Sequence, residues 1–372
     1  MDTNGQAGVG GAGSASGTPV LRRIHVIAPN FKRRLSGVTS TIIQLLPLQA
    51  RMIGIASLGP GLPAHLPKLR WWQVPGLLLK PEGRSFRIWH ARRNPEMLAG
   101  VVLKKLFRAP LRLVFTSASQ RNHTRYTRWL IRRMDAVIAT SRKSARYLKV
   151  DNTVIMHGVD TNRFSPPKDR AEAIRAVGLD PSQHYVGCFG RVRHQKGTDL
   201  FVDAMIRLLP DRPGWSAIIA GRTTPSHAAF EAQLRGRVDR AGLTERILFL
   251  GEQTEIPRYY RALSLFVAPQ RWEGFGLTPL EAMATGMPVV AADVGAFSEL
   301  IEQGVTGAVV PPDDLDAMSA AAAGWMDDET RRQEASRAAL ELIHSKFQLQ
   351  GEAEKILAVY EALWSAGSMG PA

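Results

Sequence analysis

Residues 271–288, with the sequence RWEGFGLTPLEAMATGMP, have the pattern of a loop that becomes a helix. Thr278 and Glu281 have the spacing of a capping box, in which a threonine N-cap pairs with a glutamate three residues later. Pro279 suits the first helical position, and Gly286 suits the residue just beyond the helix end. We therefore predict a short helix that Thr278 caps and that ends before Gly286.

Two glycines before this helix indicate an anion-binding loop. Gly274 and Gly276 have no side chains to cover the backbone N–H groups, and such groups at the start of a helix bind phosphate. Glu273 lies beside them, although a carboxylate and a phosphate repel each other. Its place is better explained if it accepts hydrogen bonds from the hydroxyl groups of a ligand that also carries phosphate. A nucleotide-sugar is such a ligand.

The composition is that of a globular protein with two domains. The chain has 372 residues, of which 45% are hydrophobic, and this length is more than one ordinary core requires. We find no apolar run of about 20 residues and no signal peptide, so we expect a cytoplasmic location. Cys188 is the only cysteine, which excludes disulfides within the chain, and its apolar neighbours predict a buried strand residue.

The positive charge is concentrated in the first half of the chain. Residues 1–165 contain 27 Lys and Arg against 6 Asp and Glu, a net charge of +21, and the remainder contains 21 against 27, or −6. A basic half attracts nucleic acid, an anionic membrane surface or an anionic substrate, and charge alone does not separate these classes. We expect the two halves to bind different partners.

Short apolar strands alternate with helices on both sides of a turn-rich segment at residues 157–167. This alternation predicts an α/β protein with two doubly wound, Rossmann-like parallel sheets and a ligand between the domains, at the carboxyl ends of the strands. One expected strand covers residues 69–74, and one expected helix is capped by Asn94. The predicted parts are a disordered leader, two domains and a C-terminal helix with tail, over residues 1–17, 18–165, 166–347 and 348–372.

Two further loops precede predicted helices. Residues 190–197, GRVRHQKG, place Arg191 and Lys196 where a strand ends, and a guanidinium with an ammonium suits a diphosphate. The spacing of a P-loop is absent. Alone, these charges fit a solvated loop, but beside the Glu273 loop we favour diphosphate binding. Gly37 begins the other helix, and its loop is either a phosphate or sugar site or a capped turn.

Several of these motifs resemble the retaining GT-B glycosyltransferases of the glycogen-synthase-like superfamily. They are the Glu-x7-Glu pair Glu273 and Glu281, Arg191 with Lys196 five residues later, and the turn at residues 158–164. In addition, residues 29–39, PNFKRRLSGVT, and 116–121, TSASQR, are similar to the mannosyltransferases of lipopolysaccharide core assembly. The resemblance implies a GT-B architecture, with the acceptor on the N-terminal domain and the nucleotide-sugar on the C-terminal domain. It also implies that residues 348–372 cross back to the N-terminal domain.

The resemblance assigns roles to the donor residues. Glu273 would hold sugar hydroxyls near the anomeric carbon, and Arg191 and Lys196 would neutralise the diphosphate. Glu281 would hold the ribose hydroxyls, although the capping box is a second explanation for its carboxylate. The remaining donor contacts would come from Gly37 and from the backbone amides of Phe275, Gly276, Leu277 and Thr278.

The first domain supplies histidines and arginines. In this family a histidine after the fourth strand often contacts the donor sugar, so His90 is either a catalytic-site residue or a core histidine. Arg92 stands where many relatives have a second histidine. His123 is either a site residue or an ordinary residue at a helix start. The candidate acceptor contacts, which a solvated basic face would also explain, are Arg33, Arg34, Arg92, Arg93 and Arg121.

The resemblance implies transfer of mannose from GDP-mannose to an anionic glycolipid such as the lipopolysaccharide inner core, with retention of configuration and peripheral contact with the inner membrane. We expect no cofactor or metal ion, because Asp314 and Asp316 begin a helix, where acidic residues cap. A UDP-sugar donor and a GT-B sugar-nucleotide epimerase remain alternatives. A nucleic-acid-binding protein is disfavoured, since no such motif is present and Glu273 would have no purpose.

Overall fold

The described strands form two parallel sheets whose strand orders agree, except that the first sheet has one additional edge strand. The computed structural model describes residues 20–33 and 37–368, and its first sheet has the order β3-β2-β1-β4-β5-β6-β7. The strands are β1 (Val26–Pro29), β2 (Ile55–Leu58), β3 (Lys68–Leu69), β4 (Arg87–Ala91), β5 (Leu111–Ser117), β6 (Ala136–Ala139) and β7 (Thr153–Val154). The helices between them are η1 (Leu21–Arg23), α1 (Gly37–Met52), η2 (Trp71–Leu78), α2 (Asn94–Lys105), α3 (Arg125–Ile131) and α4 (Arg142–Ala145).

The second sheet repeats this arrangement with the order β10-β9-β8-β11-β12-β13. Its strands are β8 (His184–Phe189), β9 (Trp215–Ala220), β10 (Ile247–Gly251), β11 (Leu265–Ala268), β12 (Val289–Ala292) and β13 (Gly307–Val310). The helices are α5 (Arg170–Arg175), η3 (His194–Lys196), α6 (Thr198–Leu208), η4 (Pro225–His227), α7 (Ala228–Arg240), α8 (Ile256–Ala262), α9 (Thr278–Ala284), α10 (Phe297–Leu300), α11 (Leu315–Met326), α12 (Glu329–Lys346) and α13 (Leu349–Ser368).

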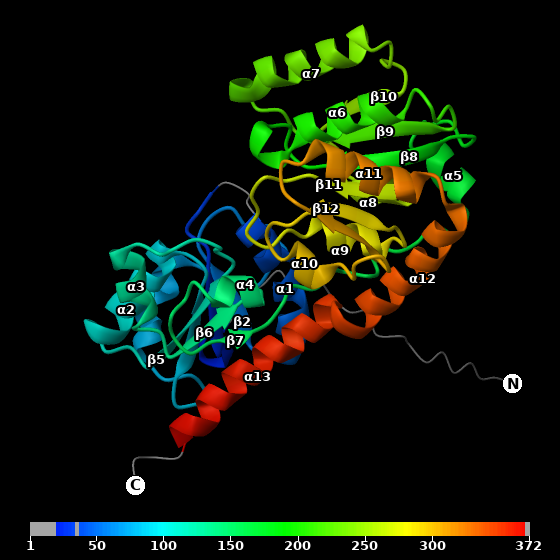
Figure 1. The fold of residues 1–372 in the computed structure, drawn as a ribbon. Coiled ribbons are helices and arrows are strands. Elements are labelled where there is room, and N and C mark those ends of the chain that lie inside the picture. Colours follow the sequence, from blue (N-terminus) through cyan, green and yellow to red (C-terminus); the bar gives the residue numbers. More distant parts are fainter. Residues whose placement is uncertain (1–19, 34–36, 369–372) are drawn as a thin grey trace, which may run out of the picture.

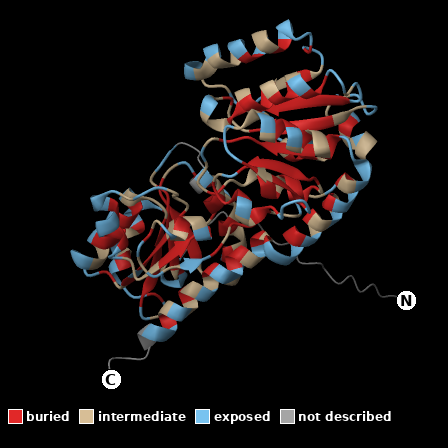
Figure 2. Cartoon of the chain, in the orientation of Figure 1, coloured by how far each residue is buried: buried red, intermediate tan, exposed pale blue. Residues whose placement is uncertain are grey.

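Both strand orders are those of doubly wound α/β domains, which confirms the predicted fold class. In each sheet the chain order reverses beside the first strand, β1 or β8, and ligands of such sheets bind at the carboxyl ends near this point. Cys188 is buried within β8, as predicted, and burial raises the pKa of its thiol to about 12. Figure 2 shows the strands of both domains as buried elements under partly exposed helices.

The first sheet is covered on both faces. One core lies under η2, α2 and α3 and contains Leu77, Met97 and Leu130. The other lies under α1 and α13 and contains Tyr360 and Trp364. Figure 1 shows α13 running from the second domain along the first, so this last described helix packs on the first domain. No helix in the described part of the chain has the length and apolarity needed to cross a membrane.

Two local predictions for the first domain are wrong. The strand expected over residues 69–74 ends at Leu69, and the 3-10 helix η2 follows. Trp72 is 71% exposed, so this apolar run is not buried as an interior strand would be. Pro75, which follows it, has no backbone N–H to donate to a neighbouring strand. The N-cap of α2 is Arg93 instead of Asn94, whose amide donates to the Thr127 hydroxyl at 2.8 Å. The expected leader, residues 1–17, lies outside the described residues.

Candidate active site

The loop between β11 and α9 contains Glu273 and is held against α10. Gly276 has a φ of 88°, and a Cβ at this position would overlap the Phe297 ring, so only glycine fits. The Ala296 amide donates to the Phe275 carbonyl at 3.0 Å. By contrast, within the described residues the amides of positions 275–278 donate to no protein acceptor. The loop therefore has a fixed shape and presents free N–H groups to a ligand.

The predicted capping box does not form. The N-cap of α9 is Leu277, and Thr278 is already inside the first turn and caps nothing. The Glu281 side chain accepts a hydrogen bond from the Tyr260 hydroxyl at 2.9 Å instead. Burial raises the pKa of the Glu281 carboxyl, and the hydrogen bond from Tyr260 and the charge of Arg163 act in the opposite direction. Capping is therefore no longer an explanation for Glu281.

The β8 loop meets the β11 loop through an ion pair. The Lys196 ammonium contacts the Glu273 carboxylate, and each of the two side chains is about one-fifth exposed. The Glu273 carboxylate also accepts from the Gly274 amide at 3.1 Å. The groups predicted to hold the diphosphate and the sugar therefore lie in direct contact, at the carboxyl ends of neighbouring strands.

Arg191 is the second cation of this loop. Its side chain is half-buried and makes no hydrogen bond or ion pair within the part of the chain that is described. Arg271 behaves differently, because its guanidinium binds the Asp199 carboxylate at 2.7 and 2.9 Å and the Asp313 carboxylate at 2.8 Å. Arg271 therefore anchors the Glu273 loop, and Arg191 is free to bind an anion. Sequence reasoning overlooked the anchor because its partners lie far from it in the chain.

His90 is a core residue in this structure. It has no exposed surface, its Nδ1 lies 2.6 Å from the Tyr360 hydroxyl, and its Nε2 lies 2.7 Å from the Thr116 hydroxyl. Burial and the neighbouring charge of Arg92 lower the pKa of His90 well below its usual range, so the ring is neutral. Both ring nitrogens are occupied by protein hydroxyl groups, which favours the alternative of a core histidine over a donor contact.

Two of the candidate acceptor arginines take part in structural contacts. The Arg93 guanidinium donates to the Asn30 side chain at 2.8 Å and to the Glu96 carboxylate at 2.7 Å, so it ties the end of β1 to α2. The Arg92 guanidinium donates to the His90 carbonyl at 3.3 Å, and burial lowers its pKa. Neither side chain is as available to an acceptor as the sequence suggests.

The other first-domain candidates lie on the surface or outside the described residues. Arg33 and Arg121 are exposed, and Gly37 is the exposed first residue of α1. Arg34 lies outside the described residues. His123 precedes α3 and is half-buried, and burial together with nearby arginines lowers its pKa.

The two domains touch beside the Glu273 loop. A Cβ on Gly274 would lie 3.0 Å from the Ala118 carbonyl oxygen, which follows β5 of the first domain. The Glu299 carboxylate of α10 accepts from the amides of Arg142 and Lys143 at 2.8 and 2.9 Å, at the start of α4. The first domain therefore directly contacts the Glu273 loop and helix α10.

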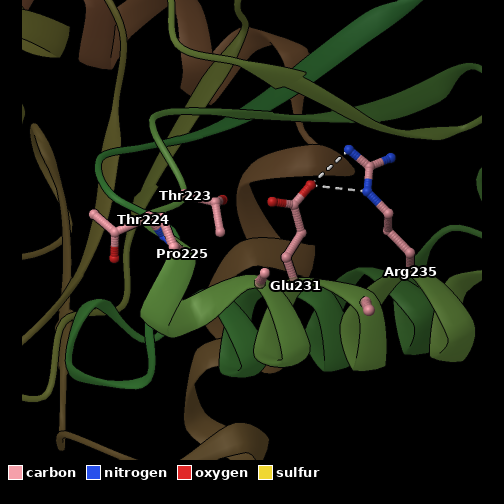
Figure 3. A pocket seen from close by; sticks show the side chains of 7 residues that line it. Thr223, Thr224, Pro225, Glu231 and Arg235 are labelled. Atoms are coloured by element: carbon pink, nitrogen blue, oxygen red, sulfur yellow. Dashed lines mark hydrogen bonds and ion pairs between the residues drawn. The ribbon is translucent and has the colours of Figure 1, made fainter.

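An open pocket of about 410 Å³ lies between the loop after β9 and helix α7 (Figure 3). Its charged groups, Glu231 and Arg235, pair with each other at 2.7 Å. None of the predicted site residues lines this pocket. Nor do the described residues contain a cluster of three or more His, Cys, Asp or Glu side chains that would suit a metal ion. Asp314 caps α11 by accepting from the Ala317 amide at 2.8 Å, which confirms its predicted capping role.

Comparison with known proteins identifies the family. Residues 169–342 match the family described as glycosyl transferases group 1. The lipopolysaccharide core biosynthesis mannosyltransferase LpsB of Rhizobium meliloti (strain 1021) is 62% identical over 347 residues, which are 92% of this chain and 99% of LpsB. The chain belongs to the group 1 glycosyltransferases. This assignment confirms the resemblance seen in the sequence motifs and makes the protein an enzyme.

Two further comparisons agree with this assignment. The lipopolysaccharide core biosynthesis mannosyltransferase LpcC of Rhizobium leguminosarum bv. viciae is 56% identical over 346 residues, covering 93% of this chain and 98% of LpcC. The crystal structure of Anabaena HepE in complex with UDP superposes with a TM-score of 0.78 at 19% identity, and covers 91% of this glycosyltransferase and all of HepE. The structural likeness confirms the GT-B fold.

Proposed function

We propose that this glycosyltransferase moves mannose from GDP-mannose to an anionic glycolipid, such as the inner core of lipopolysaccharide, with retention of configuration and without a metal ion. The contact between Lys196 and Glu273, beside the free amides of residues 275–278, supports the binding of a nucleotide-sugar. The choice of mannose and of lipopolysaccharide is supported by LpsB and LpcC, which are named for that reaction.

In the proposed reaction the bond between the sugar and the diphosphate breaks, and negative charge develops on the leaving diphosphate. Arg191 and Lys196 stabilise this charge, which grows in the transition state. Glu273 accepts hydrogen bonds from the sugar hydroxyls and stabilises the positive charge near the anomeric carbon. The leaving diphosphate accepts the proton of the attacking acceptor hydroxyl on the same face of the sugar, so configuration is retained.

A panel of nucleotide-sugars tests the donor. We expect GDP-mannose to raise the melting temperature more than UDP- or ADP-sugars, because a ligand that binds only the folded state adds about 2.7 kcal/mol of stability at a hundred times its Kd. With acceptor present, mannose should be transferred, and without acceptor the donor should be recovered unchanged. A response to UDP-sugars alone would favour the alternative donor. Conversion of the free donor into an epimer would favour the epimerase.

A glycolipid acceptor lies in a membrane, and we propose that α2 and α3 bind the cytoplasmic face of the inner membrane. The two helices lie side by side (Figure 1), and the Tyr126 and Trp129 rings of α3 stack with their centroids 6.2 Å apart. Leu106 at the end of α2 is 72% exposed. Three further exposed apolar side chains on or just after α2 extend this surface: Leu98, Val102 and Phe107. Exposed apolar side chains on neighbouring helices are typical of a surface that meets a lipid bilayer.

The charge around this surface favours an anionic bilayer. Residues 97–134 contain nine Lys and Arg and no Asp or Glu. The Arg133 guanidinium lies 3.7 Å from the centre of the Trp129 ring, so cation and aromatic ring share one surface. Basic residues near a membrane surface contribute about 1 kcal/mol each when the lipids are anionic. Several such residues suffice for reversible binding.

Vesicle sedimentation tests the membrane surface. We expect the protein to bind phosphatidylglycerol vesicles, to release them at high salt and to bind phosphatidylcholine vesicles weakly. The double variant Leu106→Glu/Trp129→Glu should bind at least about tenfold more weakly, which is a loss of about 1.4 kcal/mol. Val305→Glu is the matched control, because Val305 is an exposed apolar residue of the second domain. Equal binding by the double variant and the control would contradict the proposal.

A further inference from the structure

Tyr260 and Glu281 form a buried contact that the reaction described above does not use. Tyr260 lies in α8, is 1% exposed, and donates its hydroxyl proton to Oε2 of Glu281 at 2.9 Å. The other carboxylate oxygen, Oε1, accepts no hydrogen bond within the described residues. One oxygen of Glu281 is therefore held by the protein, and one is left for a ligand.

The tyrosine ring is fixed by other aromatic rings. Phe164, Phe189 and Phe266 surround it, with centroid distances of 5.6, 4.8 and 5.4 Å. A ring packed on several sides has few alternative rotamers, so its hydroxyl keeps one direction. Phe189 is also the last residue of β8, directly before the loop that contains Arg191 and Lys196. The same aromatic cluster therefore supports both the diphosphate loop and the Tyr260 hydroxyl.

We propose that Tyr260 is the positioning residue for Glu281, which it orients so that the second carboxylate oxygen accepts hydrogen bonds from the ribose hydroxyls of the donor. This inference rests on the proposed function and on the ribose contact that the family resemblance implies for Glu281. Without the tyrosine hydroxyl, the carboxylate loses the partner that fixes its orientation. Loss of a buried hydrogen bond to a charged group weakens binding by about 10- to 100-fold, so the effect is measurable in donor binding.

The test compares GDP with 2′,3′-dideoxy-GDP by calorimetry. The wild-type protein should bind GDP about 10- to 100-fold more tightly, because only GDP offers ribose hydroxyls to Glu281. In Tyr260→Phe this ratio should fall to a few fold, while the affinity for the dideoxy nucleotide stays within about twofold of wild type. Glu281→Gln should also reduce the ratio. Adding Tyr260→Phe to Glu281→Gln should then change it little further, because the two residues act as one unit.

Tyr185→Phe is the matched control. Tyr185 is also a buried tyrosine of the second domain, and its hydroxyl donates to the Asp180 carbonyl at 3.1 Å at the opposite end of β8. Its removal should leave the ratio unchanged. Because Tyr260→Phe keeps the ring that fills the aromatic cluster, we expect it to fold, and its melting curve checks this.

The outcomes distinguish a failure of the positioning role of Tyr260 from a failure of the ribose contact of Glu281. If the wild-type protein prefers GDP and Tyr260→Phe keeps the full preference, Tyr260 has no positioning role and the proposed function is unaffected. A uniform loss of affinity for both nucleotides in Tyr260→Phe also overturns the inference, since it indicates a merely structural residue. If wild-type protein does not distinguish the two nucleotides, the ribose contact of Glu281 and the role of Tyr260 both fail.

Discussion

Glu273→Gln is expected to lower the rate of mannosyl transfer at least about a hundredfold while the protein stays folded. The amide keeps the size of the side chain and can still accept a hydrogen bond, but it has no charge to stabilise the positive anomeric carbon. Removing one group that acts on transition-state charge typically costs a factor of about 10² to 10³. The measurement is the initial rate at saturating donor, with the melting temperature recorded for the same sample.

The effect on stability should be small by comparison. Glu273 pairs with Lys196 near the surface, and ion pairs with partial exposure contribute about 1 kcal/mol or less. Glu361→Gln is the matched control, because Glu361 also pairs with a cation, Arg84, at 2.8 Å, in the first domain. It should leave the rate within about twofold of wild type. If Glu273→Gln and this control have similar rates, Glu273 has been assigned the wrong role.

The parts of the fold that depend on local sequence pattern could be predicted. Buried parallel strands are short apolar runs, and β8 lies where the apolar neighbours of Cys188 predict a strand, since both faces of this strand are covered. The structure of residues 69–74 could not be predicted in this way. Trp71 and Trp72 belong to the 3-10 helix η2 on the surface, and an apolar run alone does not distinguish a buried strand from such a helix.

In the active site, too, the residues with local sequence signals could be predicted, and those with distant partners could not. Glu273, Arg191 and Lys196 lie in glycine-containing loops at strand ends, and these local signals predict one site from the sequence alone. The roles of Glu281 and His90 depend on partners far along the chain. Tyr260 precedes Glu281 by 21 residues, and Tyr360 follows His90 by 270. A local motif such as a capping box does not reveal these partners, because the contacts depend on how helices α8 and α13 pack in the folded protein.

Lys196→Met should weaken the binding of GDP by about 10- to 100-fold. A hydrogen bond between charged groups contributes about 1.5 to 3 kcal/mol, and Arg191 alone cannot replace a cation on the second phosphate. GMP lacks that phosphate, so its affinity should change much less, and the ratio of the two affinities is the informative quantity. Calorimetry with GDP and GMP measures it for the wild-type protein and the variant.

Two comparisons make this prediction specific to Lys196. Lys346→Met removes another lysine of the second domain that pairs with a carboxylate, that of Glu302 at 3.4 Å, and should leave both affinities unchanged. Lys196→Arg keeps the charge but replaces a compact ammonium with a planar fork, so it should recover part of the GDP affinity. Unchanged GDP affinity in Lys196→Met would remove this lysine from the phosphate site. Its contact with Glu273 would then serve only to hold the loop. The negative charge on the leaving diphosphate would be stabilised by Arg191 and the free amides of residues 275–278.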